Sequence, residues 1–252
     1  MQTLGALYAA VRRTLLAASG ALLLASSPAP AQYINPMAVS GITLPVVMNP
    51  CPGGKCTGIS QDRNRSRTGN ASPPARTQAH SATLTFTPSA ARRKQNLARF
   101  VASSNGDPAV KELAAQAPRI FPQLATAMRQ RNLNPDSVAD TYAMWWISAW
   151  DAAHGNTGTR SASVYTAVKQ QAAEAMLNTP KLTGASAALK QEMAEALTVH
   201  TLLIDIAMEH AKNDPAQLKA VGQAAATGAR RMGVDLSAMT LTAQGFQGAG
   251  AR

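Results

Sequence analysis

Acidic and histidine side chains follow one face of a predicted helix over residues 136–153. Asp140, Asp151 and His154 belong to this face. Asp151 and His154 are three residues apart, so a helix brings them within reach of one metal ion or one hydrogen bond. Carboxylates also gather in the first turn of a helix, where the helix dipole stabilises them, and Asp140 has this position. The pattern leaves open an acid–base or metal site, but we expect a solvated polar face.

A second predicted helix, residues 185–211, carries Glu195 and His200 toward its apolar side. A buried carboxylate near an imidazole would have a shifted pKa and could transfer protons. A buried histidine with satisfied hydrogen bonds is the more common case, however. The chain has no His-Glu-x-x-His, no Gly-x-Ser-x-Gly and no glycine-rich phosphate loop. We therefore expect no metal and no cofactor, and no catalytic residue is assigned beyond weak candidates. These candidates are Asp140, Asp151, His154, Glu195 and His200.

Four aromatic residues are concentrated in the predicted helix 136–153: Tyr142, Trp145, Trp146 and Trp150. Stacked indoles can form a platform for sugars or peptides, and they are also common core side chains. The sequence leaves both interpretations open, with the core favoured. Because neighbours on a helix diverge by about 100°, Trp145 and Trp146 cannot point the same way, and at least one ring should reach a second surface.

Start and stop signals divide the rest of the chain into helices. An N-cap oxygen followed by proline at the first helical position marks four helix starts. Glycines mark two helix ends. The starts are Thr87-Pro88, Asp107-Pro108, Asn134-Pro135 and Asp214-Pro215, the glycines are Gly155 and Gly233, and Ser161 is expected to cap a further helix. We expect an all-α fold, a compact bundle of six to seven helices.

The predicted helix 185–211 is apolar almost all round, so we expect it to be the central helix of the bundle. Its narrow polar strip consists of Gln191, Thr198, Thr201, Asp205 and Lys212. After Gly233 the apolar residues Leu236, Met239, Leu241 and Phe246 stand in a non-helical context and are expected to close one end of the bundle. The predicted helical domain covers residues 83–246, with a loose C-terminus at 247–252.

The first 31 residues have the three parts of a secretory signal peptide. Arg12 and Arg13 precede an apolar run over residues 15–25, and an Ala-x-Ala end follows at Ala31. The apolar run is shorter than the roughly 18–20 residues that a membrane span needs. We expect cleavage after Ala31 and a periplasmic or secreted protein without a transmembrane span.

Residues 32–82, here called the basic segment, have the composition of a disordered linker, rich in Arg, Asn, Ser, Gly and Pro. Residues 32–94 carry eight basic and one acidic side chain, whereas residues 95–252 carry fourteen basic and twelve acidic ones. A basic run in a polar segment can attach a protein to an anionic surface. The expected partner is therefore an anionic surface of the cell envelope rather than nucleic acid. The arginines concerned are Arg63, Arg65, Arg67 and Arg76.

The two cysteines, Cys51 and Cys56, enclose Pro-Gly-Gly-Lys. An oxidising compartment favours a disulfide between them. A loop this small would stabilise the chain only slightly, because the entropy removed from the unfolded state grows with loop length. A redox-active pair is the alternative, although the spacing is not Cys-x-x-Cys.

Five stretches together resemble an uncharacterised family of secreted bacterial proteins, a domain of unknown function. They are residues 86–89, 96–101, 138–146, 190–197 and 239–246. The resemblance covers about residues 83–246 and misses the basic segment. It implies an exported helical domain and brings no activity, cofactor or catalytic residue.

From these observations we expect a secreted or periplasmic helical binding module. The basic segment would hold it on the envelope, and the helix of Tyr142 and Trp150 would offer the contact surface. The alternative is a cell-envelope hydrolase that uses Asp, Glu and His side chains of the helices 136–153 and 185–211.

Overall fold

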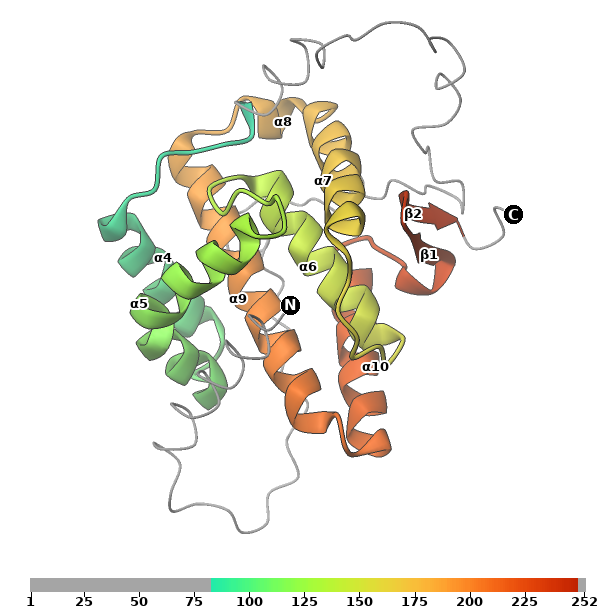
Figure 1. Ribbon diagram of the computed structural model, residues 1–252. Helices are drawn as coiled ribbons and strands as arrows, with labels where there is room; N and C mark the ends of the chain where they lie inside the picture. Colours follow the sequence, from blue (N-terminus) through green and yellow to red (C-terminus); the bar gives the residue numbers. More distant parts are fainter. Residues whose placement is uncertain (1–82, 249–252) are drawn as a thin grey trace, which may run out of the picture.

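The computed structural model describes residues 83–248, which form a bundle of seven α-helices with a small β-hairpin (Figure 1). The helices are α4 (Ala90–Ser103), α5 (Pro108–Arg129), α6 (Val138–Ala153), α7 (Ala162–Leu177), α8 (Pro180–Thr183), α9 (Ala187–Ala211) and α10 (Pro215–Arg231). The predicted all-α class is confirmed. Within residues 83–248, no helix is long and apolar enough to cross a membrane.

The predicted signal peptide and the basic segment lie outside the described residues. The same holds for the Cys51–Cys56 loop and for the arginines at 63, 65, 67 and 76. These expectations remain predictions.

Two of the four predicted proline starts are correct. The side chains of Asp107 and Asp214 accept hydrogen bonds from the first backbone N–H groups of α5 and α10. Helix α4, by contrast, is capped by Ser89 rather than Thr87. Helix α6 is capped by Ser137, because the Asn134 side chain accepts from the N–H of Asp136 and closes a turn before the helix. A residue before proline therefore marks a helix start only where its side-chain oxygen is available to accept from the first N–H groups of the helix.

The predicted helix ends are confirmed at both glycines. Gly155 follows the last turn of α6 with φ +66°, and Gly233 follows α10 with φ +79°. This left-handed conformation strains residues with a Cβ, so glycine suits the position. Ser161 stands at the start of α7 as predicted, although its side chain makes no capping hydrogen bond there.

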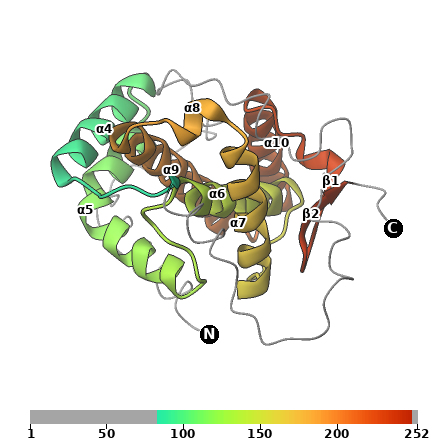
Figure 2. The same ribbon diagram turned by 90° about the horizontal axis from the view of Figure 1, so that it is seen from above.

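Helix α6 shares the centre of the bundle with α9, the helix predicted to be central, which packs against α4, α5, α6 and α10. Helix α6 packs against α7, α9 and α10, and nearly all its residues are buried. Figure 2 shows α6 and α9 between α4 and α5 on one side and α10 and the hairpin on the other. The expected polar strip of α9 is wrong in part, because Gln191, Thr198 and Thr201 are buried.

The C-terminal apolar residues form a hairpin on the bundle, as expected for a closing segment. Strands β1 (Met239–Thr242) and β2 (Gly245–Gly248) pair antiparallel, with Leu241 opposite Phe246. Phe246 is fully buried. The Gln171 side chain of α7 accepts from the Phe246 N–H and donates to the Phe246 carbonyl, both at 2.8 Å. Strand β2 extends through Gly248, so residues 247 and 248 belong to the fold and not to a loose end.

The described chain enters the bundle beside the start of α6. Leu84 and Phe86 are buried. The Phe86 N–H donates to Asp136 O at 3.0 Å, and the Val138 N–H donates to Leu84 O at 3.1 Å. These two bonds fix where the basic segment joins the folded domain.

Candidate functional site

The C-terminal end of α6 is the one place in residues 83–248 where several predicted site residues meet at the surface. Trp150, Asp151 and His154 lie there together with Arg160 from the loop before α7. His154 is exposed, and Asp151 and Arg160 are half-buried. This group of four residues is called the α6-end cluster below.

An ion pair holds the cluster together. Arg160 Nε donates to Asp151 Oδ1 at 3.0 Å and to Oδ2 at 3.3 Å, and the Arg160 Nη2 also donates to Oδ1. Burial raises the pKa of Asp151, and the Arg160 guanidinium opposes this shift by lowering it. The hydrogen bond to Asp151 raises the pKa of Arg160. Because the guanidinium contacts both carboxylate oxygens, Asp151 orients Arg160 instead of serving as a free base.

The ring of Trp150 is the centre of the cluster. His154 stacks on it with ring centroids 4.1 Å apart, and the Arg160 guanidinium carbon lies 5.4 Å from the Trp150 ring centroid. The Trp150 Nε1–H donates to the Met239 carbonyl at 3.1 Å, which fixes the indole against the hairpin. His154 Nδ1 lies 2.9 Å from the Trp150 carbonyl. Asp151 therefore bonds Arg160, and His154 bonds the Trp150 carbonyl, instead of forming the predicted pair with each other.

A groove adjoins the cluster. It is open to the surface, has a volume of about 410 Å³, and lies between the end of α6 and helix α10. Ala152, Ala153 and Gly155 line one side, and Leu218 and Ala226 belong to the other. Its walls are therefore mostly small and apolar.

The other aromatic residues of α6 are core side chains. Tyr142, Trp145 and Trp146 are at most 1% exposed. Trp146 stacks on Phe246 with ring centroids 4.2 Å apart. The expectation that one of the adjacent indoles reaches a second surface is wrong, because helices and the hairpin enclose α6. An exposed platform is excluded for these three rings, and only Trp150, 8% exposed, borders the surface.

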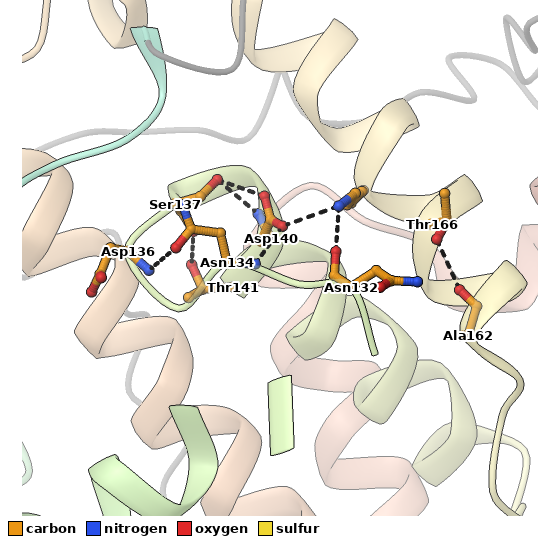
Figure 3. Close-up of polar contacts among 9 residues, drawn as sticks. Asn132, Asn134, Asp136, Ser137, Asp140, Thr141, Ala162 and Thr166 are labelled. Atoms are coloured by element: carbon orange, nitrogen blue, oxygen red, sulfur yellow. Dashed lines mark hydrogen bonds and ion pairs between the residues drawn. The ribbon is translucent and has the colours of Figure 1, made fainter. Parts of the chain in front are cut away.

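Asp140 lies in the first turn of α6, in the polar network of Figure 3. Its carboxylate accepts from the Ser137 hydroxyl at 2.6 Å and from the Asn134 N–H at 2.8 Å. Lys169 Nζ of α7 lies 3.6 Å from Asp140 Oδ2. These contacts bury Asp140, so the predicted solvated face is wrong at this end of the helix. The arrangement caps α6 and ties it to the preceding turn.

Glu195 of α9 joins that helix to α4. It accepts from Arg93 Nε at 2.8 Å, from Asn96 Nδ2 at 2.7 Å and from Gln191 Nε2 at 2.9 Å. The sequence analysis did not single out Arg93 and Asn96, and it placed Gln191 on a polar strip instead of beside Glu195. Arg93 and Asn96 are three residues apart, so a helix places them on one face. Nothing in the nearby sequence indicated that this face contacts Glu195, about a hundred residues away.

His200 is buried between α9 and α4, with its ring edge-on to Phe100 at a centroid distance of 5.2 Å. Burial lowers the pKa of His200 to about 3. The imidazole is therefore neutral near pH 7, in agreement with the expectation of a core histidine.

The five catalytic candidates do not converge on one site, because only Asp151 and His154 lie together. Asp140 and Asp151 lie eleven residues apart on α6, about 16 Å along the helix axis. Glu195 faces α4, and His200 lies further along α9. In the described part of the chain, no three His, Cys, Asp or Glu residues are grouped so that they could hold a metal ion. The contacts of Asp140 and Glu195 join elements of the fold, and only Asp151 and His154 lie at a surface site.

Arg160 is the residue of this site that the sequence did not reveal. It lies in the loop between α6 and α7, which has no periodic pattern that would orient a side chain. Only the tertiary contact with Asp151 and Trp150 gives it a role.

No curated protein and no solved structure matches the chain. A family of unknown function, DUF6683, matches residues 10–248. The match begins well before residue 83, so it takes in the basic segment, which the sequence resemblance left out. Because it spans nearly the whole sequence, the chain belongs to the DUF6683 family.

Proposed function

We propose that this protein is an exported helical interaction module that the basic segment attaches to an anionic surface of the cell envelope. The observation that carries the proposal is the distribution of charge. Arg63, Arg65, Arg67 and Arg76 lie within the fourteen residues 63–76, which contain no acid, and Asp62 just before them is the one acid of the basic segment. Such a run attracts anionic surfaces with about 1 kcal/mol per cation.

The charges of the folded domain also support attachment through the basic segment and not through the domain. Residues 83–248 contain sixteen basic and twelve acidic side chains, a net charge of +4. Five of the acids form ion pairs with cations of the same domain. Five of the twelve carboxylates of the domain are thus paired with its own cations, and the densest run of positive charge in the mature chain is in the basic segment.

Export is part of the proposal. The sequence of the first 31 residues supports it, with its basic start, its short apolar run and its Ala-x-Ala end. The expected mature N-terminus is Gln32. Intact-mass measurement of the protein from the periplasmic or culture fraction tests this, and a full-length mass in the cytosolic fraction alone would contradict it.

The α6-end cluster is the proposed contact surface for a protein or glycan partner. Trp150 and His154 offer a stacked aromatic surface, and Arg160 adds a fixed cation beside it. Aromatic and arginine side chains of this kind supply much of the binding energy at interfaces. The proposed contact is thus at one end of α6 instead of along its whole aromatic face.

Vesicle binding tests the attachment. The mature protein is sedimented with vesicles of neutral lipid alone and with vesicles that contain an anionic lipid. Replacing Arg63, Arg65, Arg67 and Arg76 by Gln should weaken binding to the anionic vesicles up to about 1,000-fold at low salt, which corresponds to about 4 kcal/mol.

The matched control removes four exposed cations of the folded domain by replacing Lys111, Arg119, Arg129 and Lys181 with Gln. The proposal requires a much smaller loss in this variant, although the net charge changes equally. Equal losses in the two variants, or equal binding to neutral and anionic vesicles, would refute a role for the basic segment.

A further inference from the structure

The groove between the end of α6 and α10 is built by a close approach of the two helices. A Cβ added at Gly222 of α10 would lie 2.6 Å from the carbonyl oxygen of Ala152, so only glycine permits this crossing. Small residues at the crossing leave a mostly apolar groove, here also called the channel, lined by Ala153 and Gly155 of the α6 end and by Leu218 and Ala226 of α10, with the longer Lys219 and Gln223 also in its lining.

The channel has the dimensions of a short extended peptide. Its α10 wall runs from Pro215 to Ala226, which is about 16 Å along the helix axis. An extended chain rises about 3.3 Å per residue, so about five residues fill that length. Alternate side chains of such a peptide would point into the channel.

Residues 42–48 of the chain have the pattern that this channel requires. In an extended conformation Ile42, Leu44, Val46 and Met48 share one face, and all four are apolar. Pro45 lacks an N–H and disfavours the centre of a β-sheet, which suits a strand laid on a surface. No other stretch of the basic segment has four apolar residues on one face of an extended chain.

The connection is long enough. The described chain starts beside the N-terminal end of α6, where the Val138 N–H donates to Leu84 O, and the groove lies at the other end of this helix, about 24 Å away. Thirty-four residues, 49–82, lie between Met48 and Thr83. A random-coil chain of that length would have an end-to-end distance of about 30 Å, enough to reach the groove, and attachment within one molecule would give residues 42–48 a high local concentration there.

The family match includes both residues 42–48 and the groove. The DUF6683 match extends from residue 10 to residue 248. A spacer needs only a composition that sets its length and stiffness. The alternating apolar pattern of residues 42–48 has no use in a spacer but is what a docked peptide needs.

We infer that residues 42–48 of the chain dock in the groove between the end of α6 and α10, beside the α6-end cluster. Docking would hold the intervening residues, with their arginines, as a loop on this side of the domain. The inference is independent of vesicle binding, because it concerns an apolar contact within one molecule.

Photo-crosslinking tests the docking in the mature protein. A benzophenone amino acid is placed at Gln223, an exposed residue of the groove, and in a separate protein at Arg119, an exposed residue of α5. Mass spectrometry of the monomer after irradiation should find peptides containing residues 42–48 attached at position 223 and not at position 119.

Two double variants with the same added charge test which face of residues 42–48 contacts the groove. Leu44→Glu with Val46→Glu places acids on the apolar face and should reduce the crosslink at position 223 at least fivefold. Thr43→Glu with Val47→Glu places them on the opposite face and should leave most of it. Absence of the crosslink, equal loss in both variants, or a crosslink between two molecules that grows with protein concentration would overturn the inference.

Discussion

His200 should make the protein less stable in mild acid. Its pKa is lowered to about 3 in the folded state, against about 6.5 in the unfolded chain. The unfolded state therefore binds more protons below pH 6.5, and the free energy of unfolding falls as the pH falls through this value. The loss continues until about pH 3, where the folded imidazole also takes up the proton.

The expected size at pH 5 follows from these two pKa values. Between pH 7 and pH 5, protonation of the unfolded imidazole lowers the free energy of unfolding by about 2 kcal/mol. Any folded-state pKa below 4 gives nearly the same result, because the folded imidazole is then neutral at both pH values. The burial of His200 at 4% exposure against Phe100 explains why the proton is excluded.

Urea unfolding at pH 7 and pH 5 measures the effect. Other groups also titrate, so the quantity of interest is the pH 7 to pH 5 difference of the wild type minus that of His200→Leu, expected to be about 2 kcal/mol. The exposed His210, changed to Gln, serves as control and should leave the wild-type pH dependence unchanged. An equally steep loss in His200→Leu would refute the reasoning.

An NMR titration of the imidazole gives the same test without a substitution. The His200 ring should remain neutral in the folded protein down to pH 5. A midpoint near 6.5 would show that the ring is solvated.

Two substitutions test the packing around the hairpin. Gly245→Ala places a Cβ 2.4 Å from Gln171 Oε1 at φ +97° and should lower the free energy of unfolding by about 2–3 kcal/mol, whereas Gly158→Ala, at an open position, should change it little in the same urea titration. Trp146→Ala removes a fully buried indole stacked on Phe246 and should cost about 3–5 kcal/mol in thermal unfolding. A loss under about 1 kcal/mol would place this ring outside the core.

Signals that act within one turn of the chain were readable from the sequence. Asp107 and Asp214 cap helices because their oxygens lie next to the N–H groups that they serve. Gly155 and Gly233 end helices because they adopt positive φ at low cost. The all-α class followed from these local signals.

The sequence did not reveal which polar side chains are buried by contacts with residues far away in the chain. Gln191 looked like part of a polar strip, yet it is buried because its amide bonds the backbone of Ser89, 102 residues away. Asp140 looked solvated, yet Ser137 and Lys169 satisfy it inside the fold. Polar residues with such partners belong to the core, and no helical wheel shows them.

For the same reason, only part of the candidate site could be predicted from the sequence. Asp151, His154 and Trp150 were named from their positions on one helix, and all three lie at its end. Their arrangement depends on Arg160 and on the Met239 carbonyl, which come from a loop and from the hairpin. Only the fold brings these groups together.

The salt dependence of vesicle binding tests the central proposal most directly. The affinity of the mature protein for anionic vesicles is measured from about 10 mM to about 150 mM salt, over which the screening length falls from about 30 Å to about 8 Å. Attachment through the arginines at 63, 65, 67 and 76 predicts a steep loss of affinity with salt, and a shallow one when the four are Gln. Equal slopes for the wild type and this variant would contradict the account.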